Sequence, residues 1–319
     1  MRCFVTGGAG FIGSNLVDRL LADGHNVVVY DNLSTGRLEY LRPALAQPKD
    51  ITVTIGDLLD LPNLTKSMNG CDFVFHLAAN ADVRYGLEHP SKDLEQNTIA
   101  THNVLEAMRA NNIKKIVFSS TGSIYGEPKI FPTPETASFP IQTSLYGASK
   151  LACEGLIAAY CEGYNFQAWI FRFVSILGER YSHGHVHAFY KQLLDNPNEL
   201  LILGDGTQSK SFLYIQDCLD AIQIAVARAT RPVNIFNLGT EEVISINDSV
   251  GIMLNQLGIS PKLTHTEGDR GWVGDNPFIL LDTSRIQGLD WNPKVSIKEA
   301  IKKTLTYLQE NPWIVEARD

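Results

Sequence analysis

Residues 3–20 read CFVTGGAGFIGSNLVDRL and join a short apolar run to a helical one through Gly7, Gly10 and Gly13. Apolar residues recur at helical spacing after the turn, from Phe11 to Leu20. Glycines in the order G-x-x-G-x-x-G permit a tight turn and close backbone approach, so that a pyrophosphate can lie against the positive end of the next helix. The stretch predicts a strand, turn and helix that bind a dinucleotide. Glycine triplets also occur in other crowded turns, so this prediction needs support from residues beyond the helix.

An acidic residue ends the second apolar run, eighteen residues past Gly13. This residue, Asp31, can accept both hydroxyls of an adenosine ribose and would repel a 2′-phosphate. We therefore expect NAD rather than NADP, with Arg37 nearby as the feature that favours NADP. Asp57 closes the third run and could reach the adenine amino group. An equally good interpretation of Asp57 is a surface carboxylate that caps a turn.

The first half of the chain alternates short β-branched or aromatic runs with longer helical stretches. Continuous apolar strands separated by helices are typical of a parallel sheet covered on both faces. We therefore expect an α/β fold, with a Rossmann-type doubly wound parallel sheet and a smaller, interleaved C-terminal substrate domain. The expected strands are Cys3–Thr6, Val27–Asp31, Thr52–Ile55, Phe73–Leu77, Ile116–Ser119, Gln167–Phe173 and Asn234–Leu238.

The clean alternation stops after Phe173, where segments rich in Gly, Asn, Pro and Asp begin. We expect an NAD-binding Rossmann domain of residues 1–174 and 218–240, and a substrate-binding domain of residues 175–217 and 241–319. Residues 127–142 contain four prolines and are expected to form neither helix nor central strand.

Composition narrows the class of protein. The chain has 319 residues, of which 44% are hydrophobic and 19% charged, as in globular proteins. Its formal net charge of −8 gives no general attraction to nucleic acid or anionic lipid, so neither is an expected partner. No apolar run is long enough to span a bilayer and no signal-peptide organisation is visible, so we expect a cytoplasmic protein. The five cysteines lack CxxC spacing, which favours buried or incidental thiols over disulfides or zinc.

Tyr146 and Lys150 are four residues apart in SLYGASKLACEGL, so both project from one face of a predicted helix. An ammonium beside a phenol stabilises the phenolate, and with a positive nicotinamide ring it could lower the tyrosine pKa from about 10 towards neutrality. The phenolate could then act as a base towards a sugar hydroxyl, with Thr121 holding the same oxygen. YxxxK occurs by chance in many proteins. Its place after a dinucleotide turn and a Ser/Thr-rich strand end makes it a catalytic candidate here.

Six motifs occur in the order seen in the extended short-chain dehydrogenase/reductase family: GGAGFIGSNL, YDNLSTG, GDLLD, FHLAAN, FSSTGSIYG and YGASK. The chain is similar in particular to the NAD-dependent nucleotide-sugar epimerase/dehydratase branch, typified by UDP-galactose 4-epimerase. The resemblance covers nearly the whole chain. It implies a Rossmann domain that holds NAD, a smaller C-terminal domain that holds an NDP-sugar, and a homodimer built through two long helices from each subunit.

The resemblance also implies roles for individual residues of the first domain. Thr121, Tyr146 and Lys150 resemble the catalytic triad, and Asn97 resembles the residue that orients the lysine. Leu77 to Ala79 resemble the strand end that lines the NAD ribose, and Ser119 lies beside the nicotinamide. The residues expected to bind NAD are Gly7, Gly10, Phe11, Ile12, Gly13, Asp31, Asn32, Asp57, Leu58, Leu77, Ala78, Ala79, Asn97, Ser119, Tyr146 and Lys150.

The second domain resembles the family with departures. Ser175 in RFVSILG stands where an asparagine commonly contacts the substrate phosphates, and Lys210 in LGDGTQSKSFLYIQD stands where an arginine is common. A lysine offers a point charge in place of a bidentate contact. Arg270 and Asp275 in GDRGWVGD match the later diphosphate-binding arginine and the acid near the nucleotide ribose. The residues expected to bind substrate are Arg84, Thr121, Gly122, Ser123, Ser175, Lys210, Arg270 and Asp275.

Two further features have alternative interpretations. Arg84 could meet an acidic sugar, although we favour a helix-entry residue that pairs with Glu88 at i+4. His183, His185 and His187 alternate in YSHGHVHAF, which would put three imidazoles on one side of an extended segment. We favour a solvated or sugar-contacting loop over a metal site, because no nearby cysteine or carboxylate cluster completes a ligand set.

The expected activity is NDP-sugar 4-epimerisation with tightly held NAD: reversible oxidation at C4, rotation of the 4-keto sugar and re-reduction. The alternatives are 4,6-dehydration, another reaction that begins with C4 oxidation, and a non-catalytic NAD-sensing protein. The sequence leaves the nucleotide and the sugar open. Gly122 and Ser123 follow Thr121 where similar dehydratases carry an Asp-Glu pair, which favours epimerisation. The intact set of Thr121, Tyr146 and Lys150 argues against a sensor.

Overall fold

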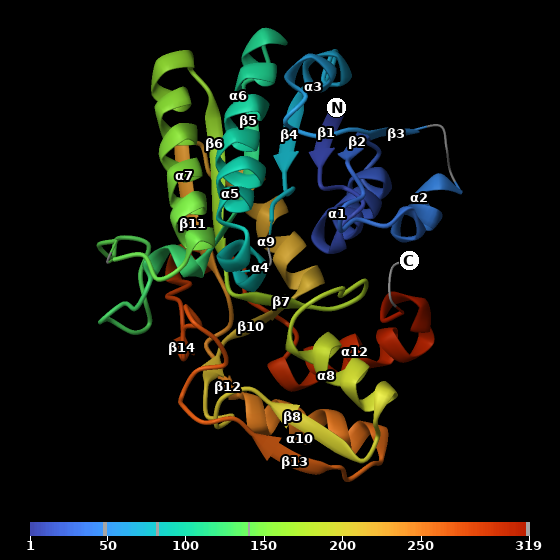
Figure 1. Ribbon diagram of the computed structural model, residues 1–319. Helices are drawn as coiled ribbons and strands as arrows, with labels where there is room; N and C mark the ends of the chain where they lie inside the picture. The colour runs from blue at the N-terminus through green and yellow to red at the C-terminus, as the bar shows by residue number, and fades with distance from the viewer. Residues whose placement is uncertain (47–49, 81–82, 140, 317–319) are drawn as a thin grey trace. The chain divides into compact units, whose positions relative to one another are not determined.

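The computed structural model describes residues 1–46, 50–80, 83–139 and 141–316, which form two compact units (Figure 1). Unit 1 comprises Met1–Gly126, Phe139–Arg172 and Ala225–Phe236, and unit 2 comprises Glu127–Ser138, Phe173–Ile224 and Asn237–Asp319. The units are interleaved in sequence. Their boundaries differ from the predicted ligand-binding domains mainly in placing residues 127–138 and 218–224 in unit 2.

Unit 1 is built on a seven-stranded sheet with the order β11-β6-β5-β4-β1-β2-β3. Strand β1 pairs in parallel with β2 and β4, β2 with β3, and β4 with β5. The strand order reverses between β1 and β4, which is the point where doubly wound sheets bind ligands at their carboxyl edge. The expected Rossmann-type sheet is confirmed. The strands are β1 (Arg2–Thr6), β2 (Asn26–Asp31), β3 (Ile51–Ile55), β4 (Phe73–His76), β5 (Lys115–Thr121), β6 (Gln167–Phe173) and β11 (Val233–Leu238).

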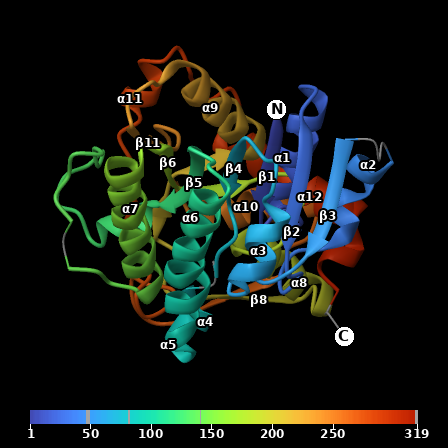
Figure 2. The ribbon, with the colours of Figure 1, turned by 90° about the horizontal axis from the view of Figure 1, so that it is seen from above.

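Helices cover the faces of this sheet. Helix α6 (Ala100–Ala110) lies between α3 (Leu61–Ser67) and α7 (Leu145–Tyr164) on one face, where a continuous core contains Phe4, Val104 and Ile170 (Figure 2). Alternate strand residues point to the other face, where α1 packs. The remaining helical segments of unit 1 are α1 (Phe11–Ala22), η1 (Leu38–Leu41), α2 (Arg42–Leu45), α4 (Val83–Glu88), α5 (Pro90–Asp93), the π-helical turn η3 (Leu94–Ile99) and η4 (Gly122–Tyr125).

Unit 2 contains small sheets in the orders β10-β7, β12-β9-β14 and β13-β8. Its strands are β7 (Ser175–Leu177), β8 (Glu199–Ile202), β9 (Ser209–Lys210), β10 (Phe212–Tyr214), β12 (Ile244–Ser245), β13 (Lys262–His265) and β14 (Phe278–Ile279). Its helical segments are α8 (His185–Asp195), α9 (Ile215–Arg228), which continues into unit 1, α10 (Ile246–Leu257), α11 (Ser284–Gln287), α12 (Ile297–Glu310) and η5 (Pro312–Ile314). The described part of residues 127–142 forms neither helix nor strand, apart from a bridge between Thr133 and Leu281.

The alternation of the three imidazoles predicted that the histidine-rich segment is extended. This prediction is wrong, because the segment enters a helix. Helix α8 begins at His185 because Val186, Phe189 and Leu193 follow at helical spacing and are buried. Residues two positions apart on a helix project in nearly opposite directions. His185 and His187 therefore do not share a side, and His183 precedes the helix.

The five cysteines are buried and form no disulfide bonds. Across the described ranges, none of the helices has the length and apolar character needed to cross a membrane.

Candidate functional site

The glycine turn brings β1 and α1 directly against the end of β4. Gly7 has a φ of +68°, and a Cβ there would lie 2.7 Å from the Ala78 nitrogen. A Cβ at Gly13 would overlap the Gly7 carbonyl oxygen. Gly10 is the N-cap of α1, and no side chain caps this helix end. The backbone therefore forms a cradle for an anion, with no side chain between the ligand and the helix N-terminus.

A buried histidine contacts the glycine cradle through Thr6. The Thr6 hydroxyl oxygen accepts hydrogen bonds from the Leu77 and Ala78 nitrogens, each at 3.2 Å, and lies 2.7 Å from His76 Nδ1. His76 Nε2 lies 2.9 Å from the Thr101 hydroxyl. Burial, aided by the Lys150 charge, lowers the pKa of His76 to about 3, so the ring is neutral. Thr6 then donates to Nδ1, and Nε2–H donates to Thr101. The sequence interpretation missed both His76 and Thr101.

Asp31 is held in place at the end of β2. Its Oδ2 accepts a hydrogen bond from the Ala9 nitrogen at 3.0 Å, and its Oδ1 accepts one from the Leu33 nitrogen at 2.8 Å. A Cβ at Gly36 would lie 2.7 Å from Oδ1. Glycine at this position therefore preserves the space beside a fixed carboxylate. This is the arrangement that recognition of ribose hydroxyls requires.

Asp57 has the turn-capping contact that the sequence left as an alternative. Its Oδ1 accepts a hydrogen bond from the Leu59 nitrogen at 2.9 Å, and its Oδ2 accepts one from Asn32 Nδ2 at 3.0 Å. Leu58 is buried, and its carbonyl accepts a hydrogen bond from Asn103. A contact from Asp57 to adenine stays a prediction.

The first turns of α7 and the end of β5 bring Tyr146, Lys150 and Thr121 together. Ser144 caps α7 by accepting a hydrogen bond from the Gly147 nitrogen at 3.0 Å. Lys150 Nζ, almost fully buried, donates to the Ser119 carbonyl oxygen at 2.9 Å. Burial lowers the pKa of Lys150 to about 8.

Burial raises the pKa of Tyr146 above its usual value, and hydrogen bonding to Thr121 opposes this effect. The expected lowering towards neutrality is therefore not produced by these residues alone. A positive charge in addition to that of Lys150 is needed beside the phenol to ionise it at neutral pH.

Asn97 reaches the catalytic helix through a neighbour of the lysine. Its Nδ2 donates to Ser149 Oγ at 2.8 Å, and Ser149 Oγ donates to the Tyr146 carbonyl oxygen at 2.8 Å. Asn97 lies in the π-helical turn η3, a distortion that often marks functional sites. The structure places Asn97 against Ser149, the residue before Lys150.

A buried ion pair lies one helical turn beyond Lys150. Glu154 accepts two hydrogen bonds from Arg172, from Nε at 3.1 Å and from Nη2 at 2.8 Å. It also accepts a 2.5 Å hydrogen bond from Ser120 Oγ, and Arg172 Nη1 donates to the Tyr125 hydroxyl at 2.7 Å. The pair ties β5, α7 and β6 together behind the catalytic face. Its only sequence signal was the spacing of Glu154 from Lys150.

Two of the four substrate-binding candidates of unit 2 contact acidic residues. Lys210 Nζ lies 2.5 Å from Asp275 Oδ1 and 5.2 Å from the centre of the Trp272 ring. Arg270 Nη1 lies 2.6 Å from Glu127 Oε1. Ser175 is exposed on β7. Lys210 and Asp275, which the resemblance assigned to separate parts of the substrate, are paired with each other.

The three histidines have different neighbours. His185 Nε2 lies 2.7 Å from Ser249 Oγ, His187 Nε2 lies 3.5 Å from the Ile314 carbonyl oxygen, and His183 stacks beside Tyr181. In the described part of the chain, no three His, Cys, Asp or Glu side chains are grouped so as to hold a metal ion. The Arg84 side chain lies outside the described residues, so neither of its interpretations is tested.

Comparisons with known proteins agree with this geometry. Residues 3–239 match the NAD dependent epimerase/dehydratase family. The chain is 34% identical to a putative UDP-glucose 4-epimerase of Methanocaldococcus jannaschii, over 96% of this chain and 98% of that protein. A crystal structure of UDP-glucose 4-epimerase from Thermotoga maritima with UDP-glucose has a TM-score of 0.88 and 31% identity, covering 98% of this chain and all of that one. A dTDP-glucose 4,6-dehydratase from Streptomyces venezuelae, solved with NAD, has a TM-score of 0.89 and 26% identity, covering 98% of each chain.

Proposed function

Because the chain belongs to the NAD-dependent epimerase/dehydratase family, we propose that it is an NAD-dependent nucleotide-sugar 4-epimerase, similar to UDP-glucose 4-epimerase. The observation that carries the proposal is the grouping of Tyr146, Thr121 and Lys150 at the carboxyl end of β5. This is the sheet edge that also holds the glycine turn and Asp31. The residues expected to contact the nucleoside diphosphate, which are Ser175, Lys210, Arg270 and Asp275, belong to unit 2.

The residues of unit 1 fit NAD. The glycine cradle at α1 suits the diphosphate, and Asp31 suits the adenosine ribose hydroxyls. The Asp31 carboxylate would repel the 2′-phosphate of NADP. When bound, NAD would supply a reversible hydride acceptor.

Three side chains of this protein transfer the proton of the C4 hydroxyl or assist its transfer. Tyr146 takes the proton of the C4 hydroxyl and later gives it back, while the Thr121 hydroxyl holds the same oxygen. Lys150 supplies a positive charge that favours the phenolate form of Tyr146. The hydrogen bond from Lys150 to the Ser119 carbonyl fixes the position of that charge.

The residues after Thr121 favour epimerisation over dehydration. Loss of water across C5 and C6 needs an acid for the leaving hydroxyl and a base for the C5 proton. Gly122 has no side chain, and Ser123 engages Thr121 through both its nitrogen and its hydroxyl. Neither residue supplies a proton at neutral pH.

We expect a product of unchanged mass when the purified protein turns over its NDP-sugar. The measurement is mass spectrometry of the products from a panel of UDP-, dTDP-, GDP- and CDP-sugars. A stable product lighter by one water would contradict the epimerase assignment in favour of dehydration. No turnover of any sugar, with no change in the absorbance of bound nicotinamide, would favour the NAD-sensing alternative.

We also propose that the enzyme is a homodimer. We further propose that it is cytoplasmic and takes part in carbohydrate metabolism. Helix α7 presents Ala152, Gly155, Ala159 and Gly163 at intervals of three or four residues, and all four are exposed. A Cβ added at either glycine would meet nothing within 4 Å. A second helix could therefore approach closely along this stripe.

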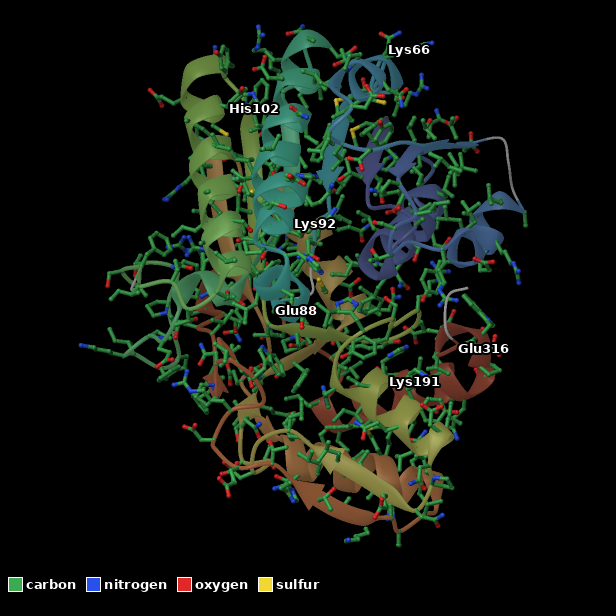
Figure 3. The ribbon with its side chains drawn as sticks, in the orientation of Figure 1. Lys66, Glu88, Lys92, His102, Lys191 and Glu316 are labelled. Carbon is green, nitrogen blue, oxygen red and sulfur yellow. The ribbon has the colours of Figure 1, made fainter. Side chains whose placement is uncertain are left out.

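The surroundings of the α7 stripe fit a subunit interface. Ile99, the residue before α6, is 41% exposed, and Leu145, the first residue of α7, is 42% exposed. His102, labelled in Figure 3, lies on the exposed side of α6 near the Tyr160 hydroxyl. Aromatic and apolar groups on an exposed face are typical of interfaces.

The variant Gly155→Arg is expected to be monomeric, because a long charged side chain would occupy the contact between the helices. Arginine is a better helix former than glycine, so the α7 helix should persist. The measurement is light scattering on the protein as it elutes from a sizing column. Gly251→Arg is the matched control, since Gly251 is also exposed on a helix with open space around it. A monomeric wild type, or a dimeric Gly155→Arg variant, would contradict the proposal.

A further inference from the structure

Unit 1 contains a buried carboxylate that the proposed chemistry does not use. Asp93, at the end of α5, is 1% exposed. Its Oδ1 accepts hydrogen bonds from Asn80 Nδ2 at 3.0 Å and from Asn97 Nδ2 at 3.2 Å. A Cβ at Gly86 would overlap its other oxygen, so the α4 backbone lies directly against the carboxylate. Burying a charge is costly unless it is paired or hydrogen-bonded, so the two asparagine amides are held against this carboxylate.

The hydrogen bonds of Asp93 continue into the catalytic helix. The Asn97 amide that donates to Asp93 also donates to Ser149 Oγ, and Ser149 Oγ donates to the Tyr146 carbonyl oxygen. Asn97 Oδ1 accepts a hydrogen bond from the Asn80 nitrogen at 2.8 Å, which fixes the orientation of the amide. A continuous chain thus connects Asp93 to the turn of α7 that bears Tyr146 and Lys150.

On the basis of the proposed function, we propose that Asp93 is a positioning residue whose buried charge sets the pH range in which the Tyr146–Lys150 pair works. It acts through the Asn97–Ser149 chain and through its electrostatic field.

The charges around the pair distinguish Asp93 from its neighbours. A negative charge opposes the phenolate and favours the ammonium, and in both cases the pKa rises. Asp93 and Cys153 each raise the pKa of both Tyr146 and Lys150, but burial raises the pKa of the Cys153 thiol, so Cys153 is uncharged at neutral pH. Glu154 raises the pKa of Lys150 and is itself paired with Arg172. Among the residues that the structure describes, the titratable or charged groups that face the pair are His76 from β4, Asp93 from α5, and Cys153 and Glu154 from α7. The Thr121 hydroxyl of β5 also faces Tyr146.

Removing the Asp93 charge should move both ionisations in one direction. In Asp93→Asn the phenol loses a proton at lower pH, so the acid limb of the rate profile moves down. The ammonium also loses its proton at lower pH, so the alkaline limb moves down as well. We expect each limb to shift by about 0.5 to 1 pH unit. Damage to packing alone would lower the height of the profile without translating it.

The test uses the NAD-loaded protein and two measurements. The first is the tyrosinate absorbance as a function of pH. The signal of Tyr146 is the difference between Asp93→Asn and the same variant carrying Tyr146→Phe. This difference is compared with that between the wild type and Tyr146→Phe. The second is the pH profile of kcat/KM for the accepted sugar. Glu95→Gln is the control, because this carboxylate lies two residues further along the chain and has some solvent exposure. Tyr146 should ionise at the same pH in Glu95→Gln as in the wild type.

The outcomes separate this inference from the proposed function. A lower pH midpoint for the ionisation of Tyr146 in Asp93→Asn supports the role of Asp93, even if no sugar is turned over. The proposal is overturned if this midpoint is unchanged in Asp93→Asn, or if Glu95→Gln shifts it by the same amount. If Asp93→Asn does not fold, Asp93→Ser supplies a smaller neutral residue whose hydroxyl can accept from Asn97, and the same criteria apply.

Discussion

Replacing Tyr146 with phenylalanine is expected to lower kcat by at least about 100-fold, the loss typical of removing a general base. The substitution deletes one hydroxyl and leaves the ring in place. Lys150 keeps its hydrogen bond to the Ser119 carbonyl, and the glycine cradle and Asp31 are untouched. The variant should therefore retain its fold and its bound NAD. Turnover and the amount of NAD(H) released on denaturation measure the two effects separately.

Tyr190→Phe is the matched control for the loss of a hydroxyl, because Tyr190 is a buried tyrosine on α8 in unit 2. It should keep wild-type turnover. Near-normal turnover by Tyr146→Phe would show that another group transfers the proton. Loss of both turnover and NAD would show instead that the hydroxyl is needed to hold the cofactor.

The sheet of unit 1 was predictable because each strand is a continuous apolar run between helical patterns. The expected strand Gln167–Phe173 has the same bounds in the structure, and the other six agree within one residue at their N-terminal ends. The small strands of unit 2 were not predictable. Ser209–Lys210 is a strand only because β12 and β14 pair with it, and neither neighbour is visible in the local sequence.

The site was predictable where its chemistry lies in a local motif. Tyr146 and Lys150 are one helical turn apart, so their proximity follows from spacing alone. The supporting residues depend on tertiary contacts that no spacing reveals. His76 contacts Thr6 across 70 positions, and Asp275 contacts Lys210 across 65. The resemblance had identified Lys210 and Asp275 as separate ligand-binding residues, and their pairing emerges only from the fold.

The second large effect concerns stability. Glu154→Ala is expected to lower the free energy of unfolding by about 3 to 5 kcal/mol, because it leaves the Arg172 charge buried without a partner. The side chains of the pair are 2% and 6% exposed, so bulk solvent does not screen the charge that is left. Ser120 Oγ loses its acceptor as well. Urea unfolding followed by fluorescence measures the loss. Asp195→Ala, which breaks the exposed pair with Lys191, is the control and should cause no measurable change.

A double variant tests whether charge compensation is the cause. Glu154→Leu with Arg172→Met removes both charges and keeps similar volumes, and such replacements of buried pairs are often neutral or stabilising. We expect it to be more stable than Glu154→Ala. It should remain somewhat less stable than the wild type, because Ser120 and Tyr125 also lose hydrogen-bond partners. A double variant as unstable as the single one would mean that these two hydrogen bonds, rather than the compensation of charge, account for the stability of the cluster.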